Sequence, residues 1–595
     1  MTIPERNEVA IENTWDLSKL FADDASWDKG VEQFESLAKQ LSDFKGTLGQ
    51  SAARLRECLD FMNEIELLDE RLGYYAMLRY SEDAGSGKNQ ERYAKYMAAA
   101  TKAQAAASYQ TPEIQSIPDD TMADFLKSRE LEPFVIPLKK ILRFKPHVLS
   151  ESEERLLALQ TEANQTARKA FEALTDVDLD FGDVDTKDGP RPLTQSTWSA
   201  FMINPDRELR EKVYLQFYGA FDKHKNTLSA LYSGNVQLDK YQAQIRGYES
   251  SREAALFPDD VPLKVYDNLV TTVSENLPLL HDYYEVKRKA LGLEQLKHYD
   301  VYVPFITDIQ VKHTYEEAVD VVIAAVAPLG KEYGDVLRAG LLGRWVDRYE
   351  NKGKRSGAFS AGSFAGDPYI LMNYKEDVLR DVFTLAHEGG HSMHSWYSSK
   401  SNPFQYYNYT IFEAEVASTF NEQLLAKYMM DKAENDGMTA YLIGKQLDDV
   451  VATIFRQTMF AEFEDTAHSL LESGTPLTVD VLRETYRKLI EKYFGPEVGL
   501  LPQSDLEGLR IPHFYRSFYV YKYATGLTAS IALAKHVLDG GEQERERYLD
   551  FLKSGGSRFP LESLKLAGVD MSKPEPVQEA MNTFRSLLET LKSLL

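Results

Sequence analysis

The stretch from residue 376 to 398 reads Glu-Asp-Val-Leu-Arg-Asp-Val-Phe-Thr-Leu-Ala-His-Glu-Gly-Gly-His-Ser-Met-His-Ser-Trp-Tyr-Ser. Its apolar residues recur at intervals typical of one face of a helix, at Val378, Leu379, Val382, Phe383 and Leu385. His387 and His391 are four residues apart, which on a helix separates them by about 40°, so both imidazole rings can reach one metal ion. The stretch therefore predicts a helix that carries two metal ligands.

The three residues between these histidines add a chemical and a packing signal. Glu388 would lie about 100° around the helix from His387, so its carboxylate should reach a water at the metal and act on it as a general base. Gly389 and Gly390 each cost about 1 kcal/mol relative to alanine in a helix. Two such residues together indicate close approach of a neighbouring segment or a substrate.

A third ligand is needed because a catalytic zinc usually has three protein ligands and one open position. His394 follows one turn later, but three ligands so close on one straight helix would strain the geometry, which favours a structural role for it. Residues 411–422 predict the next helix, and it offers Glu413 and Glu415. These two point about 200° apart, so only one can face the metal, and spacing alone does not select it.

The composition limits the class of partner and the compartment. The chain of 595 residues has a formal net charge of −24, which disfavours nucleic acid and anionic membranes as partners. Its one cysteine, Cys58, cannot form an internal disulfide. Residues 1–8 lack the basic stretch and apolar run of a secretory signal, and no uncharged apolar run approaches the roughly 20 residues of a membrane span. These features predict a cytoplasmic protein.

Helical periodicity covers most of the chain, which predicts a mainly α fold. Residues 176–192 change to an alternation of period two followed by turn residues, which indicates a hairpin. We expect a lobe boundary near it, with an N-terminal helical lobe at 1–200 and a catalytic domain at 201–595. Strand character also appears at 296–303 and in the glycine-punctuated segment 357–374.

The sequence resembles the zinc metallopeptidase family that includes oligoendopeptidase F, thimet oligopeptidase and neurolysin. The resemblance rests on His-Glu-Gly-Gly-His at 387–391, Glu-Val-Ala-Ser at 415–418, and His-Phe-Tyr-Arg-Ser-Phe-Tyr-Val-Tyr-Lys-Tyr-Ala-Thr-Gly at 513–526, with weaker support from Trp-Asp-Leu-Ser-Lys-Leu-Phe at 15–21. It implies one Zn²⁺ held by His387, His391 and Glu415. It also implies two helical lobes around a deep substrate channel, and short unfolded peptides as substrates.

The same resemblance implies roles on the substrate side of the site. A strand beside the active-site helix would pair with the peptide backbone, and we nominate the segment that begins Gly357, Ala358, Phe359, within a small β-sheet. Donors to the developing oxyanion should come from the tyrosine-rich segment 511–525. By resemblance these are His513 and Tyr521, with Tyr515 held in reserve.

Three functions are open at this stage. The first is endopeptidase action on short oligopeptides, because the motif supplies ligands, base and an open coordination position together. The second is a carboxypeptidase or dipeptidyl carboxypeptidase on the same fold, which needs a cationic group for a free C-terminal carboxylate. The third is a helical scaffold with a structural metal. It predicts no open coordination position and no effect of changing Glu388 to Gln. The oligomeric state does not follow from the sequence.

Overall fold

The computed structural model describes residues 3–306 and 311–595. It confirms a mainly helical fold with small sheets. The chain forms two compact units, each assembled from three stretches: unit 1 contains 1–146, 310–428 and 533–568, and unit 2 contains 147–309, 429–532 and 569–595. These bounds differ from the expected division at residue 200. Each unit combines stretches that are far apart in the sequence, so no single cut along the chain separates them.

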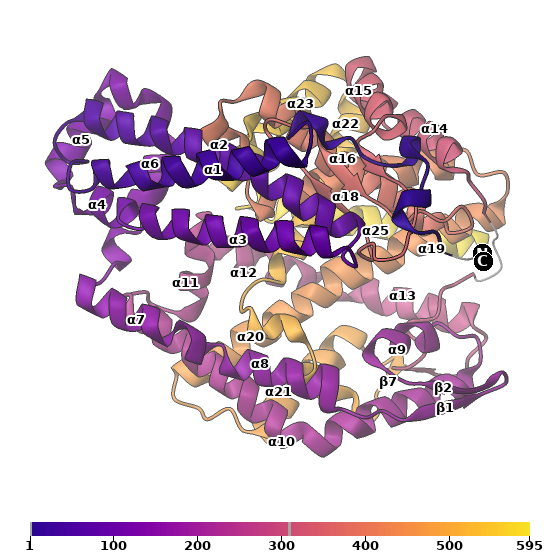
Figure 1. Ribbon diagram of the computed structural model, residues 1–595. Coiled ribbons are helices and arrows are strands. Elements are labelled where there is room, and N and C mark those ends of the chain that lie inside the picture. The colour runs from indigo at the N-terminus through magenta and orange to yellow at the C-terminus, as the bar shows by residue number, and fades with distance from the viewer. Residues whose placement is uncertain (1–2, 307–310) are drawn as a thin grey trace. The chain divides into compact units, whose positions relative to one another are not determined.

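Unit 1 contains the helix that carries His387 and His391, together with a bundle of long helices. In Figure 1, α1, α2 and α3 run alongside one another, and their packed faces bury Trp27, Phe34, Leu72 and Tyr75. The helices that lie wholly in this unit are α1 (Asp24–Gln40), α2 (Ala52–Glu82), α3 (Gly87–Ala107), α4 (Gln110–Ser116), α5 (Asp119–Lys127), α6 (Val135–Leu142), α14 (Tyr315–Ala325), α15 (Lys331–Leu342), α16 (Leu379–Ser401), α17 (Phe404–Tyr407), α23 (Glu542–Ser554) and α24 (Pro560–Leu566).

A three-stranded sheet in unit 1 lies beside α16, as the family resemblance implies. Its order is β4 (Val346–Asp347), β6 (Tyr369–Leu371) and β5 (Phe359–Ala361), so β5 is an edge strand. β5 is antiparallel to β6, and β4 is parallel to it. The sheet is close to the helix at Ser360, whose Oγ lies 2.9 Å from Ser392 Oγ. At Gly362 an added Cβ would come within 2.0 Å of Ser395 Oγ.

Unit 2 is organised around α10 (Arg207–Ile245), a helix of 39 residues that Asp206 caps by accepting from the Leu209 N–H. Its core contains stacked aromatic rings, including Trp198 and Phe217 with centroids 4.1 Å apart. The other helices wholly in this unit are α7 (Glu151–Asn164), α8 (Thr166–Ala173), α9 (Gln195–Met202), α11 (Ser251–Leu256), α12 (Leu263–Glu275), α13 (Leu277–Ala290), α19 (Asp436–Val450), α20 (Arg456–Glu472), α21 (Val479–Phe494) and α25 (Glu575–Leu594).

The predicted hairpin is present in unit 2, where β1 (Asp183–Thr186) pairs with β2 (Gly189–Pro192). The predicted strand at 296–303 reduces to β3 (Leu296–Lys297), which pairs in parallel with β7 (Val498–Gly499). Two helices continue from one unit into the other: α18 (Ile411–Asp431) and α22 (Tyr521–Gly540). Across the described ranges, every helix falls short of the length and apolarity that crossing a bilayer requires.

Candidate active site

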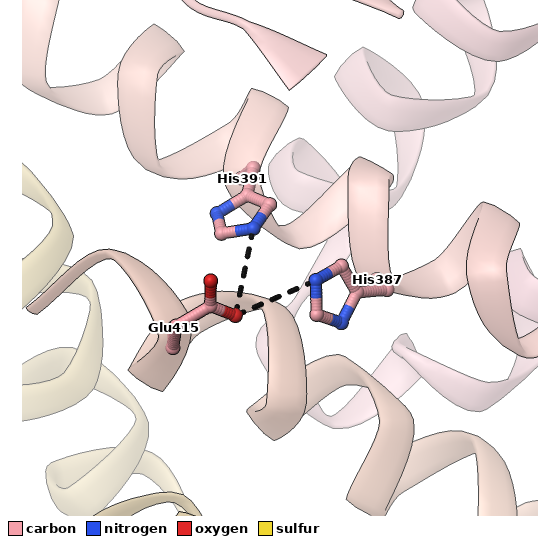
Figure 2. A group of neighbouring side chains, drawn as sticks. All are labelled: His387, His391 and Glu415. Carbon is pink, nitrogen blue, oxygen red and sulfur yellow. Dashed lines mark ion pairs between the residues drawn. The ribbon is translucent and has the colours of Figure 1, made fainter. Parts of the chain in front are cut away.

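Helices α16 and α18 bring His387, His391 and Glu415 together (Figure 2). The Nε2 atoms of His387 and His391 lie 3.5 Å and 3.8 Å from Glu415 Oε2. One ligand atom from each of the three residues lies within 4.8 Å of the other two, and no other such group of three occurs among the described residues. Two imidazole nitrogens and a carboxylate oxygen at this spacing can hold a divalent metal ion.

The close approach of α16 to α18 depends on Gly390. A Cβ at Gly390 would lie 2.5 Å from the carbonyl oxygen of Ala417 and 2.7 Å from Cα of Ser418, both in the backbone of α18. The buried Asn421 also joins the helices, because its Nδ2 donates to the Ala386 carbonyl at 3.2 Å. A Cβ at Gly389 meets only a flexible side chain, Cδ1 of Leu337 at 3.1 Å. The two glycines therefore have different roles.

Replacing Gly390 by Ala should weaken metal binding by about 10-fold or more, because the added methyl group pushes the Glu415 helix away from the histidines and overpacking costs roughly 1–3 kcal/mol. Gly389→Ala is the matched control, and its metal affinity should stay within about threefold of wild type. Chelator competition on both variants measures the difference. Equal affinities in the two variants would contradict the assigned role of Gly390.

Glu422 is a further residue at this cluster that the sequence motifs did not indicate. Its Oε1 lies 2.5 Å from His387 Nδ1, so it holds the ring with Nε2 turned toward Glu415. Burial lowers the pKa of His387, but the carboxylates of Glu422, Glu388 and Glu415, with Glu422 contributing most, outweigh this and raise the pKa to about 9. Burial lowers the pKa of His391 to about 3. Glu422 follows Glu415 by seven residues, which is two helical turns, so both lie on one face of the helix. That spacing was the sequence signal that could have placed Glu422 near the histidines.

Glu388 is buried beside this cluster, with 6% of its surface exposed. Burial raises the pKa of its carboxyl group to about 7, against the opposing effect of His387, and the Ser360 N–H on β5 donates to the carboxylate. Its Oε2 has no hydrogen-bond partner among the described residues. An acid with this pKa can accept and return a proton near neutral pH.

Two residues near His387, His391 and Glu415 lie outside this group of candidate ligands. Glu413 is buried and accepts from the N–H and the hydroxyl of Thr410, at 3.3 Å and 3.1 Å. His394 is also buried, and its ring stacks on Tyr409 with centroids 3.6 Å apart. Burial lowers the pKa of His394 to about 3, so it packs as a neutral ring. The geometry therefore places Glu415 in the group of candidate metal ligands. Glu413 and His394 lie outside this group, where they make hydrogen bonds and packing contacts.

The nominated substrate strand lies next to Glu388. Gly357 has a φ of +83° and, with Ala358, leads into β5, which begins at Phe359. Beyond the strand, the loop at Phe364 is held by Glu70, whose Oε1 accepts the Phe364 N–H at 2.8 Å. Because β5 is an edge strand, its outer side is the one on which a peptide backbone could pair.

The tyrosine-rich segment belongs to unit 2. His513 is exposed on η12 (Pro512–Tyr515), and Tyr523 Oη lies 3.4 Å from its Nε2, with the Tyr519 ring nearby. Tyr515 is 9% exposed and stacks on Phe171 in α8. Tyr521 is fully buried against the ring of Tyr266, and burial raises its pKa. The accessible residues of this segment are thus His513, Tyr519 and Tyr523. The substrate-side roles of His513, Tyr515 and Tyr521 stay predictions.

Comparison with known proteins relates the whole chain to a family of peptidases. The model of peptidase family M3 matches residues 200–583, and that of oligopeptidase F matches 113–181. The chain is 42% identical to an oligoendopeptidase F homolog of Borreliella burgdorferi, over 99% of both chains. It is 41% identical to oligopeptidase PepF of Bacillus subtilis, over all of this chain and 89% of the relative.

Two solved structures are also similar to this chain over nearly its full length. A putative peptidase from Chlamydophila abortus is similar over 100% of both chains, with a TM-score of 0.95 and 35% identity. Oligoendopeptidase F from Enterococcus faecium is similar over 96% of this chain and 99% of its own, with a TM-score of 0.74 and 32% identity. Together with the His-His-Glu cluster and the buried Glu388, these matches establish that the chain belongs to peptidase family M3, as a metallopeptidase of the oligoendopeptidase F group.

Proposed function

We propose that this protein is a zinc-dependent endopeptidase that hydrolyses internal bonds of short, unfolded oligopeptides. The observation that carries the proposal is the position of Glu388, buried next to the His387, His391 and Glu415 cluster and within reach of the edge strand β5. The restriction to short peptides is supported by the names of the relatives, oligoendopeptidase and oligopeptidase.

The donor set suits a single zinc ion. Neutral imidazole and carboxylate are the ligands that zinc takes in peptidases, and three of them leave one coordination position open. A bound zinc ion supplies a Lewis acid that acidifies water and polarises the scissile carbonyl. His387 and His391 would bind it through Nε2, with Glu422 fixing the orientation of His387.

The chain's own groups then carry the proton and position the peptide. The Glu388 carboxylate accepts a proton from the attacking water and delivers one to the leaving amine. The edge of β5 would align the peptide by strand pairing, which brings the scissile bond beside Glu388. His513 and a tyrosine of the same segment would donate to the oxyanion that forms on the carbonyl.

The tyrosine donor can be identified by removing single hydroxyl groups. The resemblance selects Tyr521, whereas the accessible surface next to His513 favours Tyr523. Losing the true donor should lower kcat by about 10²-fold while fold and metal content are unchanged, because one such donor contributes on the order of 3 kcal/mol. Tyr521→Phe and Tyr523→Phe are assayed side by side. If both retain wild-type kcat, the test moves to Tyr515→Phe and Tyr519→Phe, and four silent variants would refute a tyrosine donor.

A peptide library tests the reaction itself. Mass spectrometry should find cuts at internal bonds of short peptides, loss of all cuts after chelation, and their return with one equivalent of zinc per chain. Peptides with an amidated C-terminus should be cut as well as free ones. Failure on amidated peptides would replace the endopeptidase by a carboxypeptidase, and cleavage that survives metal removal would refute metal dependence.

The composition of the chain supports a proposal for its cellular setting. The acidic chain, with one cysteine, is suited to a reducing compartment, and we propose the cytoplasm. Short peptides are the expected partners, and neither nucleic acid nor a membrane surface is expected to bind a chain of net charge −24.

A further inference from the structure

The segment that carries His513 contains a strained turn. Between η12 and α22, Phe518 has a φ of +56°, a left-handed conformation that disfavours residues with a Cβ. Among the described residues, Asp260 is the only other non-glycine residue with positive φ. The turn returns the chain toward η12, so that the Tyr519 ring lies parallel to the His513 ring, with centroids 6.4 Å apart. The grouping of His513, Tyr519 and Tyr523 therefore depends on the conformation of Phe518.

A buried acid holds this turn from α20. The Phe518 N–H donates to Glu464 Oε1 at 3.0 Å, and Glu464 is fully buried. Burial raises the pKa of Glu464 well above its ordinary range, and the nearby Asp239 and Asp465 raise it further. Its Oε2 has no hydrogen-bond partner among the described residues. A buried acid in these surroundings is unfavourable for stability, so its contribution lies in the conformation that it imposes on Phe518.

A second acid and an amide hold the turn from α10. Ser517 Oγ donates to Asp239 Oδ2 at 2.5 Å. Asn235 Nδ2 lies 3.3 Å from Ser517 Oγ and 3.4 Å from the Phe514 carbonyl oxygen. The ring of Phe518 packs on His468, whose Nε2 lies 3.1 Å from the same Asp239 oxygen. The turn is thus held at Phe514, Ser517 and Phe518 by side chains outside the segment.

We propose that Glu464 and Asp239 are positioning residues, which keep Phe518 in its left-handed conformation and thereby aim His513 and its neighbouring tyrosines. The proposal rests on the proposed function, in which this segment supplies donors to the substrate. It assigns to two carboxyl groups, the buried Glu464 and the partly buried Asp239, an effect on turnover without contact with the substrate. Glu464 acts through its acceptor oxygen and needs no negative charge for this task.

Two substitutions of Glu464 separate its acceptor from its charge. Glu464→Gln keeps an oxygen for the Phe518 N–H and should retain kcat within about threefold. Glu464→Met has similar volume but no strong acceptor, so the turn relaxes and kcat should fall by about 10-fold or more, with KM within about twofold. Thermal melting should show that Glu464→Met is folded, and metal analysis that it is loaded. Equal kcat values in the two folded variants would overturn the proposal.

Glu462, two residues earlier on the same helix, provides the matched control. Glu462 pairs with Lys492 and is only partly buried, so Glu462→Met makes the same chemical change away from the turn. Its kcat should match wild type. A drop equal to that of Glu464→Met would mean that any lost carboxylate on α20 impairs the enzyme, which overturns a specific role for Glu464.

His513→Ala distinguishes this proposal from the proposed function. If His513→Ala has wild-type kcat, the proposed role of His513 as a donor is refuted. If His513→Ala is impaired but Glu464→Met is not, only the positioning role is refuted. If both are impaired, the double variant should be no more than about threefold worse than His513→Ala, because the two changes remove the same contribution. Full additivity would overturn the proposal.

Ser517→Ala tests the second anchor, Asp239, without changing either carboxyl group. It removes the hydroxyl that Asp239 accepts, and kcat should fall several-fold with unchanged KM and metal content. Wild-type kcat in this variant would remove Asp239 from the proposal.

Discussion

Glu388→Gln should retain zinc and bind peptides with wild-type affinity while kcat falls by about 10³-fold or more, since proton transfer by a positioned side chain contributes about 10²–10⁴-fold. The amide has nearly the same shape as the acid, so the packing against β5 is preserved, but it can neither accept nor return a proton. Metal analysis, peptide binding and steady-state kinetics on one preparation measure the three quantities.

The result also separates an enzyme from a scaffold with a structural metal. Wild-type kcat in a zinc-loaded Glu388→Gln protein would eliminate Glu388 as the base. Loss of zinc in this variant would instead mean that Glu388 supports the metal, in contrast to its position outside the ligand cluster.

Glu415→Gln should lose the metal and with it nearly all activity, because the carboxylate is the one anionic member of the ligand set. Zinc content after dialysis against a weak chelator is the measurement. Added zinc should restore little activity at concentrations that saturate the wild type.

Glu413→Gln is the control on the same helix. Glu413 is buried near Thr410, outside the metal cluster, so this variant should keep its zinc and its activity. Zinc loss in Glu413→Gln with retention in Glu415→Gln would show that the register of α18 against α16 is not the one described above.

Local signals predicted much of the fold. The period of 376–398 predicted α16, and the change to period two with turn residues predicted the hairpin β1–β2. The expected strand at 296–303 was shorter than its alternation indicated, because only Leu296 and Lys297 find a partner, at β7. Strand pairing depends on a distant segment, so a local pattern sets its propensity and not its length.

The division into units could not be read from the chain. Unit 1 draws on three stretches, and the composition changes near residue 190 mark a hairpin inside unit 2. Compact units are defined by contacts between distant segments, which leave no single boundary in the sequence.

By itself, the sequence predicted the pair of histidines and the glutamate between them, because the relative positions of His387, Glu388 and His391 follow from the geometry of one helix. The residues alone left Glu413 and Glu415 open, because the choice depends on the rotation of α18 against α16. Only the tertiary structure revealed why Gly390 has no side chain and that Glu422 orients His387. It also buried Tyr521 and left Tyr523 beside His513. These features depend on packing between elements, and helical periodicity within one segment carries no information about such contacts.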